Sequence, residues 1–182
     1  TNKIICCSKY IENSIIKNFE INSDKTKCIY NSYDEEKFKY KKTFSLKNKI
    51  NSDSEITIGM VGRLEVHKDQ ESLIKSIKLL KSKHYKIKLL LAGDGSYRGR
   101  LSKLVKKLDL DKSVKFIGYQ IEIDKVLDKF DIFVFSTTKD EGFGIAMVEA
   151  MGKGLPIIAS NVGGLPEIIG NNGILINKIN SK

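Results

Sequence analysis

The stretch that organises this chain follows an apolar run at 131–136 and reads Asp140-Glu141-Gly142-Phe143-Gly144-Ile145-Ala146-Met147-Val148-Glu149-Ala150-Met151. Its two glycines predict a loop whose backbone can approach a ligand closely, and the apolar residues after them predict a short helix. The free N–H groups at the start of that helix would form a seat for a phosphate. Glu149 is the only charged residue between Ile145 and Met151. We expect it to be paired or to line a pocket, because burying a lone carboxylate is costly.

Strand-like and helix-like segments alternate around this stretch. Apolar runs predict strands at 3–7, 26–30, 56–61, 87–92, 114–117, 132–135, 156–160 and 173–176. Helices are predicted at 8–19, 70–81, 97–108 and 121–130, after Gly144, and as a short turn at 165–169. Strands that are continuous apolar runs are typical of a sheet covered on both faces. We therefore predict an α/β domain with a doubly wound, Rossmann-like parallel sheet, which binds ligands at the carboxyl ends of its strands.

Composition narrows the functional classes. The 182 residues, 41% of them hydrophobic, suit a globular domain, and no apolar run approaches the roughly 20 residues of a membrane span. The net charge of +10 would attract nucleic acid, anionic lipid or phosphorylated substrates. However, the chain has only three arginines and its lysines are scattered along the sequence. We therefore interpret the charge mainly as a lysine-rich composition and expect no nucleic-acid partner.

The cysteines and histidines do not predict a metal site. Cys6, Cys7 and Cys28 have no C-x-x-C spacing, so we expect reduced, mostly buried thiols in a cytosolic protein. His67 and His84 are far apart, and we expect them at the surface. The dinucleotide fingerprint G-x-G-x-x-G, the P-loop and the G-x-S-x-G motif are all absent from the sequence.

Three loops fall at the ends of predicted strands. In the first, Arg63 and Lys68 could clamp a diphosphate, or the loop could simply be solvated. In the second, Gly118 and Tyr119 could form a flat surface against which a nucleobase stacks, although an ordinary turn also explains them. The third is the 140–151 stretch. There, Glu141 could be a solvated loop acid, Glu149 could be a helix acid paired with a nearby lysine, and Phe143 could be an ordinary core residue.

Taken in order, these motifs resemble the carboxyl-terminal, donor-binding domain of a GT-B glycosyltransferase. The most similar family is the large retaining one called glycosyltransferase group 1, or family 4. The resemblance runs from about Cys28 to Ile176 and rests on the segments 58–64 with Lys68, 91–95, 114–119, 141–144, 149–151, 154–156 and 163–167. Each motif is weak alone, whereas the ordered series is specific.

The resemblance implies roles for individual residues. Glu149 would accept hydrogen bonds from the ribose hydroxyls of a nucleotide-sugar donor, and Glu141 would orient the donor sugar. Arg63 and Lys68 match the pair that contacts the diphosphate. The other binding residues implied by the match are Gly118 and Tyr119 near the base, and Gly142, Phe143, Gly144, Ile145 and Ala146 in the loop and helix start.

The implied reaction is transfer of a hexosyl group from a UDP- or GDP-sugar to a hydroxyl of a saccharide or glycolipid acceptor, with retention. Two cations and a helix N-terminus can stabilise the departing diphosphate, so we expect no metal or other cofactor. The usual setting of the family implies polysaccharide biosynthesis by a cytoplasmic enzyme. Peripheral contact with the inner face of the cell membrane is part of the same expectation.

The chain departs from the family pattern in two residues and in length. Ser32 and Asp69 stand where glycine is usual or frequent. We expect residues 1–19 to be the tail of an otherwise absent amino-terminal domain, 20–54 the interdomain connection, and 55–182 the nucleotide-sugar-binding domain. The lysine-rich segment 35–53 within that connection could be a frayed helix or a linker. Such a fragment should bind nucleotide and transfer little or no sugar alone.

Other functions remain open from the sequence. A nucleotide-sugar epimerase or a phosphorylase could share the GT-B fold. A basic domain could bind RNA or an anionic membrane without being an enzyme, although aromatic residues interleaved on a basic stripe are missing. A dehydrogenase is disfavoured because the dinucleotide fingerprint is absent.

Overall fold

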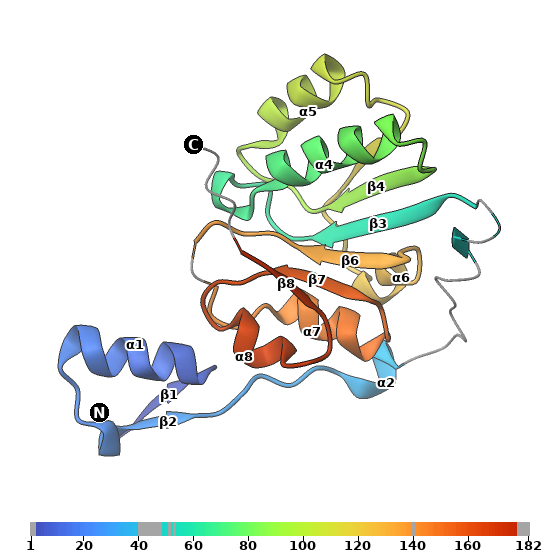
Figure 1. Cartoon of the computed structure of the whole chain (residues 1–182). Coiled ribbons are helices and arrows are strands. Elements are labelled where there is room, and N and C mark those ends of the chain that lie inside the picture. The colour runs from blue at the N-terminus through green and yellow to red at the C-terminus, as the bar shows by residue number, and fades with distance from the viewer. Residues whose placement is uncertain (1–2, 40–48, 51, 53, 140, 178–182) are drawn as a thin grey trace.

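A six-stranded parallel sheet forms the centre of the computed structural model, which describes residues 3–39, 49–50, 52, 54–139 and 141–177 (Figure 1). The strand order is β5-β4-β3-β6-β7-β8. The strands are β3 (Ile56–Val61), β4 (Ile87–Ala92), β5 (Val114–Gly118), β6 (Ile132–Phe135), β7 (Ile157–Ser160) and β8 (Ile174–Ile176). This order reverses between β3 and β6, as in a doubly wound sheet. The predicted α/β fold is confirmed.

Helices cover both faces of this sheet (Figure 1). One face packs against α4 (Gln70–Ser82) and α5 (Arg98–Lys107), and the other against α2 (Glu35–Phe38), α6 (Ile123–Leu127), α7 (Ile145–Gly152) and α8 (Leu165–Ile169). Alternate residues of β4 supply both cores: Leu89 and Leu91 face α4 and α5, while Leu90 and Ala92 face the other layer. Burial on both faces explains why the strands appear in the sequence as continuous apolar runs.

Most predicted bounds agree with the structure, but α6 is shorter than its predicted range of 121–130. It ends at Leu127, and the amides of Lys129 and Phe130 then donate to Val126 and Leu127 in a tighter turn. That turn lets Phe130 enter the core at the start of β6. Apolar spacing alone does not separate such a turn from a continued helix.

A smaller unit precedes the main sheet. In it β1 (Ile4–Cys6) pairs in parallel with β2 (Thr26–Cys28), and α1 (Lys9–Phe19) connects the two strands (Figure 1). As predicted, Ser8 caps α1, and its hydroxyl accepts a hydrogen bond from the Ile11 amide at 3.2 Å. A short 3-10 helix, Ser23–Lys25, precedes β2.

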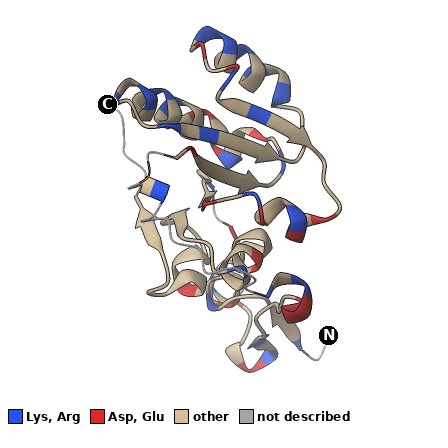
Figure 2. Ribbon diagram, turned by 90° about the vertical axis from the view of Figure 1, so that its right-hand side faces the viewer, with Lys and Arg blue, Asp and Glu red and all other residues tan. Residues whose placement is uncertain are grey.

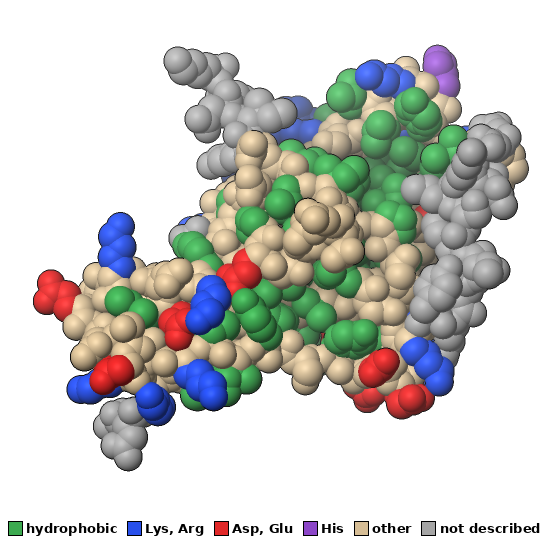
Figure 3. Space-filling view, turned by 60° about the horizontal axis from the view of Figure 1, so that its bottom comes forward, with side chains coloured by type: hydrophobic (Ala, Val, Ile, Leu, Met, Phe, Trp, Pro, Cys, Tyr) green, Lys and Arg blue, Asp and Glu red, His purple; other side chains and the backbone are tan. Residues whose placement is uncertain are grey.

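A two-stranded sheet with one helix cannot cover all its apolar side chains. The Phe19 side chain is 71% exposed, and apolar residues also reach the surface on the face shown in Figure 3.

The expectation of mostly buried cysteines is wrong, because this small unit cannot cover them. All three thiols are free, but only Cys6 is buried, whereas Cys7 and Cys28 are half-buried. The later segment 35–53 starts as α2, and its residues 40–48, 51 and 53 lie outside the described part.

The fold gathers cations that are separated in the sequence. Helices α4 and α5 pack side by side on one face, where blue segments concentrate in Figure 2. Between them they carry eight cationic residues and one acidic residue, Glu71. The charge is therefore less evenly distributed over the surface than along the chain. Among the helices that the structure describes, none is long and apolar enough to cross a membrane.

We predict that Gly59→Ala destabilises the protein by about 1–3 kcal/mol, because an added methyl group would overpack the core. A Cβ at this central β3 position would lie 2.0 Å from the buried Phe130 ring. Gly99→Ala is the matched control. Its Cβ would meet nothing within 4 Å, and alanine should add up to about 1 kcal/mol in α5. Urea unfolding measures both changes, and equal midpoints for the two variants would contradict this account of the core.

Candidate functional site

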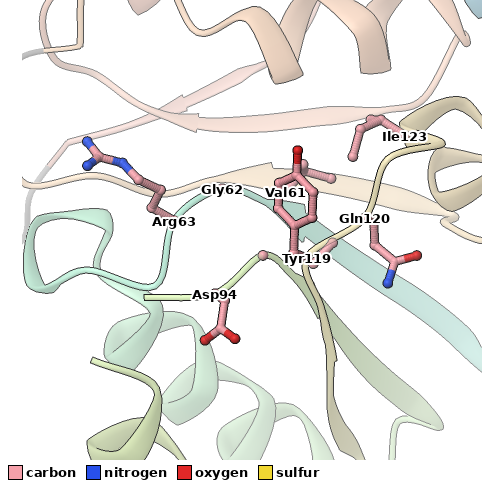
Figure 4. A pocket seen from close by; sticks show the side chains of 9 residues that line it. Val61, Gly62, Arg63, Asp94, Tyr119, Gln120 and Ile123 are labelled. Carbon is pink, nitrogen blue, oxygen red and sulfur yellow. The ribbon is translucent and has the colours of Figure 1, made fainter. Parts of the chain in front are cut away.

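A pocket of about 240 Å³ lies at the carboxyl ends of β3, β4 and β5 (Figure 4). It is beside the reversal of strand order between β3 and β6, where doubly wound sheets bind their ligands. Its lining residues are Val61, Gly62, Arg63, Ala92, Gly93, Asp94, Tyr119, Gln120 and Ile123. Two residues predicted from separate motifs, Arg63 and Tyr119, therefore line the same pocket.

Tyr119 gives the pocket a flat aromatic surface. It follows Gly118, which ends β5 with φ +71°, a conformation that favours glycine. Gly118 itself does not line the pocket, but its carbonyl accepts a hydrogen bond from the Gly93 amide at 2.7 Å. The Tyr119 side chain is 78% exposed and stands near Gln120 in Figure 4. The exposed ring and the apolar Val61 and Ile123 suit a flat, partly apolar ligand.

Arg63 supplies positive charge at the rim of the pocket. Its guanidinium extends away from the side occupied by Gln120 and Ile123 (Figure 4). Arg98 pairs with Asp94 at 3.0 Å and Arg100 with Glu71 at 2.7 Å. By contrast, the Arg63 guanidinium makes no ion pair or hydrogen bond with any residue that the structure describes. Its planar set of donors is thus available to an anion.

Lys68 is not a free cation beside Arg63, as a simple diphosphate clamp would require, because it is paired with Glu141. Its Nζ forms an ion pair with Glu141 Oε2 at 2.5 Å and lies 5.0 Å from the centre of the Phe135 ring. Glu141 is therefore a paired and partly buried acid, with 24% of its side chain exposed, rather than a solvated loop acid. The Glu141 Oε1 atom has no hydrogen-bond partner among the described residues.

Hydrogen bonds hold the loop after β3 against the end of β6. Ser136 Oγ donates to the Lys68 carbonyl at 2.8 Å, and Thr137 Oγ1 donates to the His67 carbonyl at 3.0 Å. Asp69, where the family frequently has glycine, adopts φ +50° between a 3-10 helix (Val66–Lys68) and α4. Aspartate is one of the few other residues that tolerate this region, which explains the departure.

The start of α7 follows the predicted glycine loop. Gly144 has φ +81°, and no side chain within the described residues caps the helix. Its first amides, including those of Ile145 and Ala146, are therefore open to an anion. Phe143 is buried and lies 6.4 Å from the Tyr30 ring, so its side chain supports the loop from the core. Any ligand contact by Phe143 is left to its backbone.

Glu149 is half-buried in α7 and has no hydrogen bond or ion pair with the residues that the structure describes. Burial raises the pKa of this carboxyl above its ordinary value, and the Lys37 charge partly opposes the effect. Lys37 also lies 3.9 Å from Asp124, next to the pocket residue Ile123. Among the described residues the acid has no ion-pair or hydrogen-bond partner, and its helix packs against α2. The lysine of the alternative interpretation is Lys37, which acts on Glu149 through its charge without forming an ion pair.

Sequence reasoning missed several neighbours of the site. Asp94 and Gln120 line the pocket, and their positions just after β4 and β5 were the available signal. Glu167 lies in a quoted motif, but no role was assigned to it. Burial opposes ionisation of Glu167, yet hydrogen bonds from the Tyr30 hydroxyl and two backbone amides hold its pKa below the ordinary value. The same contact raises the pKa of Tyr30 to about 12.

The predicted site residues thus form three groups: Arg63 with Tyr119 in the pocket, Lys68 with Glu141, and Glu149 in α7. Loops after β3, β5 and β6 supply the first two groups at the carboxyl ends of the strands, and α7 supplies Glu149. In the part of the chain that the structure describes, no group of three His, Cys, Asp or Glu residues could hold a metal ion. The available chemistry is anion binding, stacking and hydrogen bonding by two carboxylates.

Comparisons with known proteins agree with this arrangement. The family model of the glycosyl transferases group 1 matches residues 41–181. An uncharacterized glycosyltransferase of Methanocaldococcus jannaschii is 34% identical over 96% of this chain and 46% of its own length. The GPI3 subunit of the Saccharomyces cerevisiae phosphatidylinositol N-acetylglucosaminyltransferase is 28% identical over 93% of this chain and 38% of its own length. This chain therefore spans less than half of these two relatives.

A solved structure extends the similarity to three dimensions. The crystal structure of Anabaena Alr3699/HepE in complex with UDP and glucose has a TM-score of 0.84 and is 26% identical. The match covers 97% of this chain and 50% of that one.

We predict that Glu149→Gln raises the Tm at pH 7.5. Because the folded-state pKa is raised, the carboxylate destabilises the fold above that pKa, and the penalty disappears as pH falls below the ordinary value. The difference in Tm between variant and wild type should therefore shrink towards about pH 4. Glu35→Gln, at an exposed position, should change little. A lower Tm for Glu149→Gln at pH 7.5 would contradict the prediction.

Proposed function

Because this chain belongs to the glycosyl transferases group 1, we propose that it carries the site at which such an enzyme holds its nucleotide-sugar donor. The observation that carries the proposal is one pocket that holds an exposed tyrosine and an arginine without an ion pair or hydrogen bond to its guanidinium among the described residues. A nucleoside diphosphate presents a flat base and two anionic phosphates, which these groups complement. The UDP bound by HepE supports the same donor class.

We propose that different parts of the nucleotide bind to the pocket and to the start of α7. We assign the base to the Tyr119 side of the pocket and the diphosphate to Arg63 and the open amides at Ile145 and Ala146. Glu149 is then the acceptor for two ribose hydroxyls. Within the part of the chain that the structure describes, no side chain pairs with this carboxylate, which leaves its oxygens for several donors and supports this role.

The paired acid is assigned to the sugar. Lys68 fixes Glu141 through Oε2 and leaves Oε1 for a hydroxyl of the donor sugar. Lys68 also adds positive charge beside the diphosphate, where negative charge grows as the glycosidic bond breaks. Removing one such contact typically costs on the order of 3 kcal/mol in the transition state.

For the whole protein we propose transfer of a hexosyl group from a UDP- or GDP-sugar to a hydroxyl of a saccharide or glycolipid, with retention. The resemblance of Glu141 and Glu149, eight residues apart, to the two-glutamate motif of that retaining family supports retention. A cytoplasmic enzyme that works at the inner face of a membrane is part of the same proposal.

We predict that calorimetric titration gives saturable binding of one of UDP, GDP and ADP. Glu149→Ala and Arg63→Ala should each weaken that binding by about tenfold or more, because each removes a charge-assisted contact. Arg100→Ala is the matched control, since Arg100 pairs with Glu71 outside the pocket. No binding by the folded wild type, or equal effects of all three substitutions, would refute the assignment.

We also predict that nucleotide binding does not depend on a divalent metal. Arg63, Lys68 and the α7 amides would supply the positive potential that a metal provides in other transferases. The titration should give the same Kd, within about twofold, in EDTA and in magnesium chloride. A tenfold loss in EDTA, reversed by added magnesium, would show that a metal contributes to the site.

A further inference from the structure

We infer that Ser8 and Glu167 are positioning residues, which fix the Glu141–Gly144 loop by anchoring it to the start of α1. We call this loop the sugar loop. The inference rests on the proposed function for what the loop contacts. Its structural part, the anchoring, stands on the hydrogen bonds and packing described below.

Two side chains, those of Glu167 and Ser8, accept hydrogen bonds from the backbone amides of the first turn of α1. A helix start has N–H groups without partners inside the helix. Here the Lys9 amide donates to Glu167 Oε1 at 2.8 Å and the Tyr10 amide donates to Glu167 Oε2 at 3.0 Å. The Ile11 amide donates to Ser8 Oγ at 3.2 Å. Glu167 belongs to α8, more than 150 residues later, so this cap joins two distant parts of the chain.

Ser8 connects the same helix start to the sugar loop. Its side chain is 0% exposed, and its hydroxyl donates to the Gly142 carbonyl at 2.7 Å while it accepts from Ile11. A Cβ added at Gly142 would lie 3.4 Å from Ile11 and 3.6 Å from the Cys7 sulfur. The loop is therefore in close contact with the first turn of α1, and Ser8 uses both its donor and its acceptor there.

The opposite side of the sugar loop rests on the segment that leads into α8. The Gly164 amide donates to the Glu141 carbonyl at 2.8 Å. A Cβ at Gly163 would lie 2.4 Å from that carbonyl oxygen, and one at Gly164 would lie 2.5 Å from the Gly142 oxygen. Only glycine permits this approach.

The loop is thus clamped between α1 and the start of α8, and Glu167 ties the two clamping elements together. The Tyr30 hydroxyl, at 2.5 Å from Glu167 Oε1, completes the anchor. A shift of α1 against α8 would move the Glu141 backbone, and with it the carboxylate assigned to the donor sugar. The pocket assigned to the base, at β3 to β5, shares none of these contacts, and Arg63 in that pocket is also assigned to the diphosphate. Loss of the anchor should therefore affect the sugar more than the nucleotide.

The test compares a nucleotide with its sugar conjugate: UDP with UDP-glucose, or GDP with GDP-mannose, according to which base the wild type binds. In Ser8→Ala and Glu167→Gln, affinity for the conjugate should fall about fivefold, as for one lost hydrogen bond, while affinity for the nucleotide changes less than about twofold. Ser8→Thr keeps the hydroxyl and should restore the conjugate affinity. Ser14→Ala, which removes a hydroxyl from the same helix, is the matched control.

Equal losses for nucleotide and conjugate, or no loss in the folded variants, would overturn the positioning role. If Ser8→Ala does not fold, Tyr30→Phe removes only one hydroxyl from the anchor and serves the same comparison. Amide hydrogen exchange separates this inference from the proposed function. Exchange at Gly164 and in the sugar loop should quicken in Ser8→Ala without any ligand. Unchanged exchange would refute the anchor even if the wild type binds no nucleotide.

Discussion

The reversal of strand order between β3 and β6 is the constraint on which the candidate site depends. After β3 the chain crosses to one face of the sheet, and after β6 it crosses to the other face. The loops that follow the two strands therefore lie side by side at the carboxyl ends of the strands, with no helix between them. The β3 loop carries Arg63 and Lys68, and the β6 loop leads to Glu141. Lys68 and Glu141 can form their ion pair because the two strands are parallel and adjacent, with Ile58 paired to Ile132 and Gly59 to Phe133.

Charged residues of this protein differ in whether another part of the protein pairs with them. Buried charges away from the pocket are compensated: Asp131, for example, accepts hydrogen bonds from Lys49 at 2.6 Å and from the Thr57 amide at 2.8 Å. Of the candidate site residues, Glu149 and Arg63 lack such partners among the described residues. A half-buried carboxylate without a partner weakens the fold. A ligand that donates hydrogen bonds to Glu149, as proposed above, would offset this cost.

Local patterns in the sequence were sufficient for the sheet. The strands at 56–61 and 87–92 have the predicted bounds, because a continuous apolar run buried on both faces leaves little alternative. The Ser8 cap was also predictable, since capping depends on residues within one turn. The end of α6 and the exposure of Cys7 and Cys28 were not, because each depends on how much surface a neighbouring layer can cover.

The sequence predicts candidate residues for the site but not the contacts between them. Motif order indicated Arg63, Tyr119, Glu141 and Glu149, and the fold brings Arg63 and Tyr119 into one pocket. The Lys68–Glu141 pair joins residues 73 positions apart, and the Ser8–Gly142 hydrogen bond joins residues 134 positions apart. Such contacts depend on the packing of separate elements, which no local periodicity encodes.

The cationic layer formed by α4 and α5 has a kinetic consequence. Eight cationic residues against one acidic residue give this face a positive potential that extends about a Debye length, roughly 8–10 Å, into solution at physiological ionic strength. The adjoining β4 and β5 end at the pocket, so this potential would draw an anionic ligand of the proposed nucleotide class towards the pocket. Added salt would then slow capture of such a ligand far more than it would hasten its release.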